Sequence, residues 1–176
     1  MVFWPKVNIS AYTKFWLHGE PLKVVVEIKY LGVYIVNDLS DDVEMGKRAR
    51  GIYAAGNTLI SKFKLCNDAC KVSLFKTYCY NVYAIALWAS FRVNSYVKTK
   101  VAHNDIFRTL MQVPRYESAS TLFVEHMAMN LDSISRNAMY SLMDRLLSST
   151  NRVVKAICNS EIPLKNMEKM GSSIGS

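Results

Sequence analysis

The first 36 residues alternate between apolar and polar side chains and are rich in β-branched and aromatic types. This period of two predicts strands over residues 7–17 and 24–36. Residues 18–21, His-Gly-Glu-Pro, have the composition of a turn, so we expect the two strands to form a β-hairpin. Gly32 lies inside the second strand and indicates a bulge or a close approach of the backbone to another group.

The pattern changes at residues 37–40 from a period of two to a period of 3.6. Asp41 followed by Glu44 fits a capping box, which opens a helix. The apolar positions that follow fall on one face of this helix and predict that the face is buried. They are Ala49, Ile52, Tyr53, Gly56, Leu59, Ile60 and Phe63.

More helices follow along the chain. Asn67 or Asp68 can cap a second helix that runs to about Ser90 and is apolar nearly all round, so we expect it to be the central helix. Others are predicted over residues 95–113, 118–129, 132–147 and 151–158.

The predicted fold class is therefore mainly α with a short N-terminal β-hairpin. Residues 1–40 form the hairpin, and residues 41–158 form a helical bundle. Residues 159–176 contain too little apolar material to pack and are expected to be disordered.

Composition narrows the possible partners and the compartment. The 176 residues fit about one domain, and 22 Lys and Arg against 14 Asp and Glu give a net charge of +8. This charge favours an anionic partner, nucleic acid before an acidic membrane. No apolar stretch approaches the ~20 residues of a membrane span, and no signal peptide pattern is present. The four cysteines are expected to be free thiols rather than two disulfides, which indicates an intracellular protein, cytoplasmic and/or nuclear.

The positive charge is concentrated between Asp41 and Arg115, since residues 72–116 hold six basic side chains and one acidic. Lys100, Asn104 and Arg108 recur every four residues and form a polar stripe that could follow a phosphate backbone. A solvated helix face is the alternative.

Exposed Tyr96 or Tyr116 could stack on a base beside this stripe. The candidate residues for contacting a nucleic-acid backbone are Lys47, Arg48, Arg50, Lys62, Lys64, Lys98, Lys100, Arg108 and Arg115.

Catalytic and metal-binding patterns are missing. Asp41-Asp42 is the only adjacent acidic pair, and its place at a helix N-terminus favours capping over Mg²⁺ binding. Cys66 and Cys70 lie one helical turn apart, but zinc needs further ligands and the three histidines are scattered. We expect neither a catalytic centre nor a metal site, and no cofactor.

Two motifs carry a resemblance to a known family. Leu17-His18-Gly19-Glu20-Pro21-Leu22, followed by Lys29-Tyr30-Leu31-Gly32-Val33, resembles the end of the palm in reverse transcriptases of non-LTR (LINE-type) retrotransposons. In that family such a hairpin is followed by a helical thumb. Arg48-Ala49-Arg50 and residues 71–78 and 84–88 resemble thumb helices, and Met1-Val2-Phe3 resembles the preceding palm strand, so the resemblance spans most of residues 1–158.

The resemblance implies specific roles. Tyr30, Leu31 and Gly32 match the primer grip, which holds the 3′ end of the growing strand, although core packing also accounts for Tyr30 and Leu31. The helices after Asp41 match the thumb, which binds template–primer through its backbone.

The family's Tyr/Phe-Ala-Asp-Asp turn, which binds catalytic Mg²⁺, is missing and would lie upstream of Met1. The expected function is that of a non-catalytic fragment that binds nucleic acid, with palm and fingers supplied in trans. A degenerate remnant without activity and a helical protein-interaction module are the alternatives.

Overall fold

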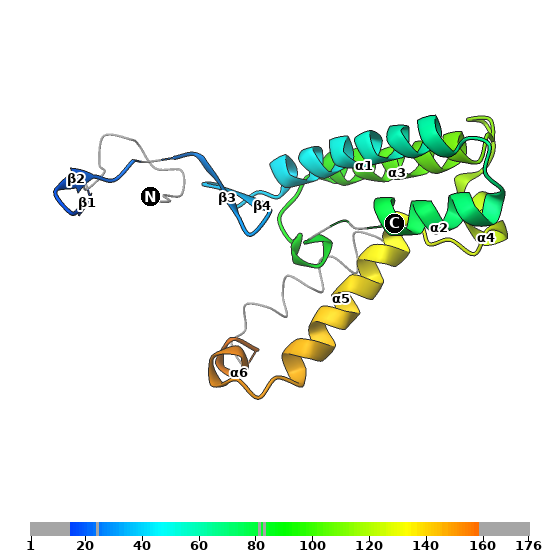
Figure 1. Ribbon diagram of the computed structural model, residues 1–176. Coiled ribbons are helices and arrows are strands. Elements are labelled where there is room, and N and C mark those ends of the chain that lie inside the picture. Colours follow the sequence, from blue (N-terminus) through cyan, green and yellow to red (C-terminus); the bar gives the residue numbers. More distant parts are fainter. Residues whose placement is uncertain (1–14, 24, 81, 83, 159–176) are drawn as a thin grey trace.

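Helices dominate the molecule, and short strands precede them. The computed structural model describes residues 15–158 except residues 24, 81 and 83 (Figure 1). The strands lie at one end of the molecule, away from most of the helices (Figure 1). The mainly α fold with a short N-terminal antiparallel hairpin is confirmed. The predicted strand over residues 7–17 and the predicted tail over residues 159–176 lie largely or wholly outside the described residues.

The strands form two small antiparallel hairpins. β1 (Trp16–Leu17) pairs with β2 (Glu20–Pro21), and β3 (Glu27–Tyr30) pairs with β4 (Val33–Val36). The prediction of one strand over residues 24–36 is therefore wrong, because the chain reverses within it.

Gly32 belongs to the reversal and not to a bulge. Leu31 and Gly32 connect β3 to β4 with φ angles of 47° and 85°. Two-residue hairpin turns need positive φ at such positions, which Gly adopts freely and Leu does not. An apolar residue in a costly backbone conformation thus forms the tip of the second hairpin.

The structure contains α1 (Asp42–Phe63), α2 (Asp68–Cys79), the 3₁₀ helix η2 (Ile85–Leu87), α3 (Val93–Leu110), α4 (Ala119–Glu125), α5 (Leu131–Leu147) and α6 (Arg152–Cys158). Local capping residues mark the starts of α2, α4 and α5. Asn67 accepts a hydrogen bond from the Cys70 backbone N–H at 2.8 Å, and Asn130 accepts one from Ser133 N–H at 2.9 Å. Each side chain satisfies an N–H group that the first turn of a helix leaves unpaired.

The predicted capping box of α1 does not form. Asp41 Oδ2 instead accepts hydrogen bonds from the backbone N–H groups of Ala89 and Ser90, both at 2.8 Å. Glu44 Oε2 accepts one from Tyr34 N–H at 2.9 Å. The two carboxylates therefore join the start of α1 to residues 89–90 and to β4.

The second helix ends at Cys79, not near Ser90 as predicted. Ala84 has a φ of 67°, which no α-helix contains. Beyond α2, Val82, Ile85 and Trp88 are buried, so this segment packs as a folded connection. The apolar composition of the segment after α2 therefore predicts its burial correctly, but the helical structure predicted for it is wrong.

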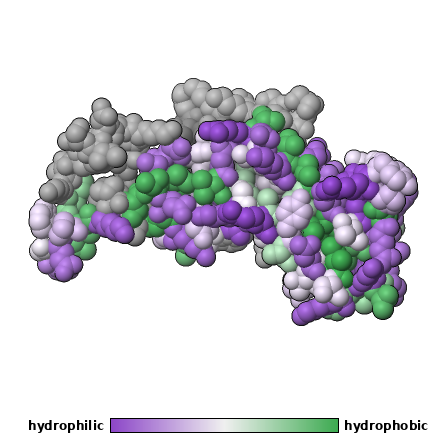
Figure 2. All heavy atoms as spheres, turned by 90° about the horizontal axis from the view of Figure 1, so that it is seen from above, coloured by the Kyte–Doolittle hydropathy of each residue, from purple (hydrophilic) through white to green (hydrophobic). Residues whose placement is uncertain are grey.

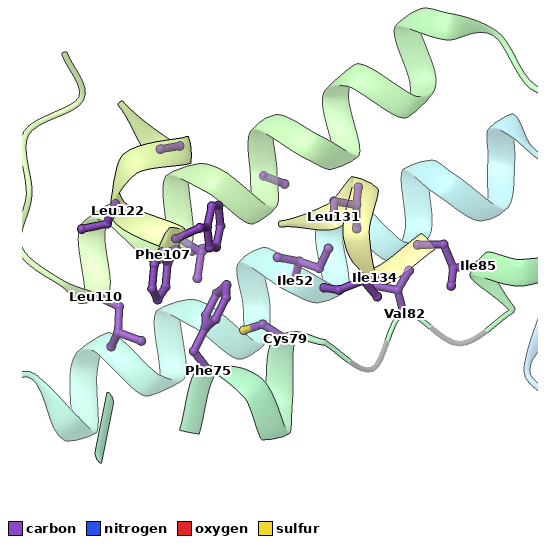
Figure 3. Close-up of a cluster of buried hydrophobic side chains, with 14 of the residues drawn as sticks. Ile52, Phe75, Cys79, Val82, Ile85, Phe107, Leu110, Leu122, Leu131 and Ile134 are labelled. Carbon is purple, nitrogen blue, oxygen red and sulfur yellow. The ribbon is translucent and has the colours of Figure 1, made fainter. Parts of the chain in front are cut away.

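The core lies between α1, α2 and α3. Thr99 Oγ1 lies 3.4 Å from the Met45 carbonyl, and Gly56 faces Ile106, so α1 and α3 run parallel. Phe75 of α2 and Phe107 of α3 point toward one another within this core, with ring centroids 4.6 Å apart (Figure 3).

Tyr53 is a further correction. It was expected on the buried face of α1, but 38% of its surface is exposed.

α5 contributes Leu131 and Ile134 to the core, packs against η2 and slants away toward α6 (Figures 1 and 3). None of the helices that the structure describes combines the length and the apolar character that crossing a bilayer requires.

Candidate nucleic-acid interface

The turn at Tyr30-Leu31-Gly32 is anchored on the first turns of α1. Arg48 Nη2 donates a hydrogen bond to the Gly32 carbonyl at 2.7 Å, and the same guanidinium pairs with the buried Glu44. Because Glu44 also accepts the Tyr34 N–H, one carboxylate holds both the turn, through Arg48, and the start of β4. Arg48, a candidate for binding phosphate, therefore supports the turn.

Glu44 was not among the residues singled out for binding. Its spacing from Arg48 is that of an ion pair across one helical turn, which is the signal that could have identified it.

The side chains at the tip of this hairpin face solvent. Tyr30 is 61% exposed and Leu31 is 73% exposed, so neither packs in the core. Beside the turn lies a cavity of about 350 Å³, whose lining includes Val33, Leu39 and Leu87. Seen from above, green hydrophobic residues form a stretch on the strand side of the helices (Figure 2).

Lys47 lies against the same hairpin. Its Nζ lies 3.2 Å from Glu27 Oε2 and 3.1 Å from the centroid of the Tyr34 ring. An ammonium held over an aromatic ring and beside a carboxylate is already stabilised within the chain. Lys47 therefore stabilises the contact between the hairpin and α1.

The polar stripe on α3 faces other parts of the protein. Lys100 Nζ lies 2.6 Å from Asp132 Oδ2 at the start of α5. Arg108 donates a hydrogen bond to the Glu117 carbonyl at 3.0 Å and lies 3.6 Å from Asp105. Asn104 is partly buried. The stripe connects α3 to the start of α5 and to the segment before α4.

The two tyrosines proposed for base stacking differ. Tyr96 is only 7% exposed and donates a hydrogen bond to Asp132 Oδ1 at 2.8 Å, so the expectation that it is exposed is wrong. Burial, together with the hydrogen bond to Asp132, raises the Tyr96 pKa. Tyr116 is 85% exposed, and its ring is accessible for stacking.

The remaining candidate cations differ in whether they form an ion pair with a carboxylate. Arg115 is largely exposed, but its Nη2 lies 2.6 Å from Asp105 Oδ2. Four others are exposed and form no ion pair with any residue that the structure describes. They are Arg50, Lys62 and Lys64 on or directly after α1, and Lys98 on α3.

The adjacent carboxylates Asp41 and Asp42 both accept hydrogen bonds from backbone N–H groups of the protein. Asp42 Oδ1 accepts the Arg92 backbone N–H at 2.9 Å, next to the segment that Asp41 holds. Burial raises the pKa of Asp41 despite its two hydrogen bonds. Burial acts to raise the pKa of Asp42 as well. Hydrogen bonds, first among them the one from the Arg92 backbone N–H, nevertheless lower the Asp42 pKa below its usual range.

Within the described residues, no three His, Cys, Asp or Glu side chains gather as metal ligands. In comparisons with known proteins, no family model, curated protein or solved structure matches the chain.

Proposed function

We propose that the chain is the end of the palm and the thumb of a non-LTR retrotransposon reverse transcriptase, and that it binds template–primer without catalysing a reaction. The observation that carries the proposal is the turn at Tyr30-Leu31-Gly32. Its apolar tip is exposed to solvent, has a costly backbone conformation and is fixed to α1 through Arg48. Exposed residues in strained conformations concentrate at functional sites, and this turn lies where the family's primer grip is expected.

The unpaired cations support a contact with the nucleic-acid backbone. Arg50, Lys62, Lys64 and Lys98 are exposed and have no carboxylate partner among the described residues. Lysine and arginine bind phosphates of any sequence and release counterions on doing so. The net charge of +8 adds long-range attraction to the same polyanion.

The proposal assigns no metal to this chain. In the family, Mg²⁺ is held by the catalytic carboxylates, and none of the motifs in these 176 residues matches that turn. The palm and fingers would be partners supplied in trans, in an intracellular compartment where a template–primer is present.

Binding can be measured by fluorescence anisotropy with an RNA–DNA duplex that has a recessed 3′ end. We expect the affinity to fall steeply between about 50 and 200 mM salt, because backbone contacts release counterions. Replacing Arg50, Lys62, Lys64 and Lys98 with Gln should lower the salt slope by as much as ~3.6. Binding that is absent at about 50 mM salt, or independent of salt, contradicts the proposal.

A charge-matched control separates these positions from the net charge. Gln at Lys76, Arg136, Arg152 and Lys155 removes the same number of exposed cations. We expect this control to retain most of the salt slope. Equal losses in the two variants would show that binding depends on total charge and not on the assigned positions.

The turn is tested separately by replacing Tyr30 and Leu31 with Ala. Both side chains are exposed, so the fold should be retained. We expect the preference for a recessed 3′ end over a blunt duplex to decrease while the salt slope stays unchanged. An unchanged preference would contradict the primer-grip assignment but would not affect the proposed contacts with the nucleic-acid backbone.

A second candidate function is protein interaction, and the apolar cavity beside the hairpin favours it. Exposed apolar surface of this kind is typical of protein interfaces. Under this candidate, Leu31→Glu should abolish capture of the chain by a palm-containing partner, whereas the Gln variant of the four unpaired cations should be captured normally. The reverse pattern would favour direct binding to nucleic acid.

A further inference from the structure

The two edges of the β3–β4 hairpin have different surroundings. The hairpin lies beyond the start of α1 (Figure 1). On the outer edge of β4, the Tyr34 N–H donates a hydrogen bond to Glu44 of α1 at 2.9 Å. On the outer edge of β3, the backbone N–H and C=O groups of Glu27 and Lys29 bond to none of the residues that the structure describes. Within that part of the chain, β3 therefore presents an open edge.

The register of the hairpin directs these backbone groups outward. Just before β3, the Val26 carbonyl accepts a hydrogen bond from the Asn37 N–H at 2.9 Å. Positions that bond to the neighbouring strand alternate with positions that do not along an antiparallel pair. Counting from Val26, Glu27 and Lys29 are at the positions that do not bond to β4. Their N–H and C=O groups therefore point away from β4 and are available to another strand.

The side chains along this edge carry opposite charges on either side of Ile28. Glu27 and Lys29 are exposed. The Lys29 Nζ lies 5.6 Å from the centroid of the Tyr34 ring, and the Glu27 carboxylate lies 3.2 Å from the Nζ of Lys47 on α1. Both charged side chains thus lie on the face of the hairpin that is next to α1. The Ile28 side chain lies on the other face, because side chains alternate along a strand.

Two copies of this strand complement each other in one register. If two β3 strands pair antiparallel with Ile28 opposite Ile28, Glu27 of each copy lies opposite Lys29 of the other. The outward backbone groups of these two residues then meet as hydrogen-bonded pairs. Registers centred on Glu27 or on Lys29 instead place like charges opposite each other, which is unfavourable. The charges therefore select the register that is symmetric about Ile28.

We propose that the open edge of β3 is a dimerisation surface and that its partner is β3 of a second copy of this chain. The pairing is related by a two-fold axis through Ile28, so the same surface is used on both copies. It joins two hairpins into one four-stranded antiparallel sheet, whereas a two-stranded hairpin alone is only marginally stable. The contact area is small, so the dimer is weak and forms in a concentration-dependent way.

Sedimentation equilibrium of the whole chain over a range of concentrations tests the association. The apparent mass of the wild type should rise with concentration toward that of a dimer. Lys29→Glu places two carboxylates opposite each other and should weaken the dimerisation constant by about tenfold. The matched control is Lys23→Glu, which makes the same change of charge at an exposed position outside β3 and should associate like the wild type.

A charge exchange separates strand pairing from damage to the hairpin. Glu27→Lys alone should also weaken association, because each copy then presents two lysines along the edge. An equal mixture of Glu27→Lys and Lys29→Glu should dimerise again, since every lysine of one variant faces a glutamate of the other. A hairpin that either substitution had unfolded could not regain association on mixing.

Cross-linking tests the register in a background with Ser at Cys66, Cys70 and Cys158. Ile28→Cys places the two introduced thiols opposite each other, where Cα atoms lie about 4.5 Å apart and a disulfide can form. Diamide should therefore convert this variant to a covalent dimer. Ile35→Cys, on the same face of β4, is the control and should stay monomeric, because three strand spacings of about 4.8 Å separate its two copies.

Three results would overturn the proposal. One is a wild-type chain that stays monomeric at every concentration, which would leave a strand of a different protein as the occupant of the edge. Another is equal association of Lys29→Glu and Lys23→Glu. The third is equal cross-linking of Ile28→Cys and Ile35→Cys, which would show random collision and not a paired register.

Discussion

His103 is a buried imidazole surrounded by aromatic rings. Its ring centroid lies 4.9 Å from that of Phe75, 5.4 Å from that of Phe123 and 5.9 Å from that of Tyr80. Neither ring nitrogen has a hydrogen-bond partner among the residues that the structure describes. Burial lowers the pKa to about 4, and the negative charge of Asp132 only partly opposes this shift. The core therefore holds His103 as a neutral side chain with two unsatisfied polar atoms.

This residue predicts a loss of stability in mild acid. The folded-state pKa of about 4 lies below the unfolded value of 6.5, so the unfolded chain binds more protons between these values. The stability is fully present above pH 6.5 and decreases as the pH falls toward 4. Between about pH 7.5 and 5 the loss should be about 2 kcal/mol, measured by chemical denaturation.

His103→Leu removes the titrating group and its unsatisfied nitrogens. We expect the variant to lose most of this pH dependence and to be at least as stable as wild type at neutral pH. The half-buried His126 offers a control, and His126→Gln should keep the wild-type dependence. A wild-type acid response in His103→Leu would assign the titration to other groups.

At the scale of the elements, α1 and α3 meet at Gly56. A methyl group at this position would overlap the buried Ile106 side chain, 2.6 Å from its Cδ1 atom. Gly51, on the same helix, has open space where a methyl group would be. Alanine substitutions at these two glycines therefore measure the effect of helix propensity and the effect of packing separately.

We expect opposite effects from the same substitution. Gly51→Ala should raise the free energy of unfolding by ~0.5–1 kcal/mol, because alanine favours the helix. Gly56→Ala should lower it by ~1–3 kcal/mol, because overpacking outweighs that gain. Urea unfolding followed by circular dichroism measures both, and stabilisation in both variants would show that the helices can move apart at little cost.

Asp132 joins α5 to α3 through two partners, the Tyr96 hydroxyl and the Lys100 ammonium. Asp132→Ala should cost ~2–3 kcal/mol, because it removes the charged acceptor of the buried Tyr96 hydroxyl. Lys100→Met should cost less than about 1 kcal/mol, because that ammonium is partly exposed. Equal losses in denaturant unfolding would place the stabilisation in the ion pair instead.

The sequence predicted the helices whose starts are marked by local capping residues, but it missed the equally local reversal within residues 24–36. Asn67, Ser118 and Asn130 each accept a hydrogen bond from a backbone N–H three residues on, so helix starts can be identified from nearby residues alone. The end of α2 has no such signal. At this end the Tyr80 hydroxyl accepts a hydrogen bond from the Met129 N–H, a contact between distant residues that a local pattern does not contain.

The candidate site also combines local features with contacts between distant parts of the sequence. The turn at Leu31-Gly32 connects two strands within a few residues, where the alternation pattern predicted one continuous strand. Lys100 and Arg108 recur at helical spacing, but their partners come from α5 and from the segment before α4. Periodicity shows which face of a helix a residue lies on but not what covers that face.

For the whole molecule, the parallel arrangement of α1 and α3 has a kinetic consequence. The contacts of Asp41 with Ala89 and of Met45 with Thr99 join residues 48 and 54 positions apart. The intervening chain, including α2, must be in place before the first helix gains its main partner. Closing so long a loop precedes any stabilisation from those contacts and slows folding. During synthesis, the part of α1 that packs against α3 would leave the ribosome uncovered and stay so until α3 follows.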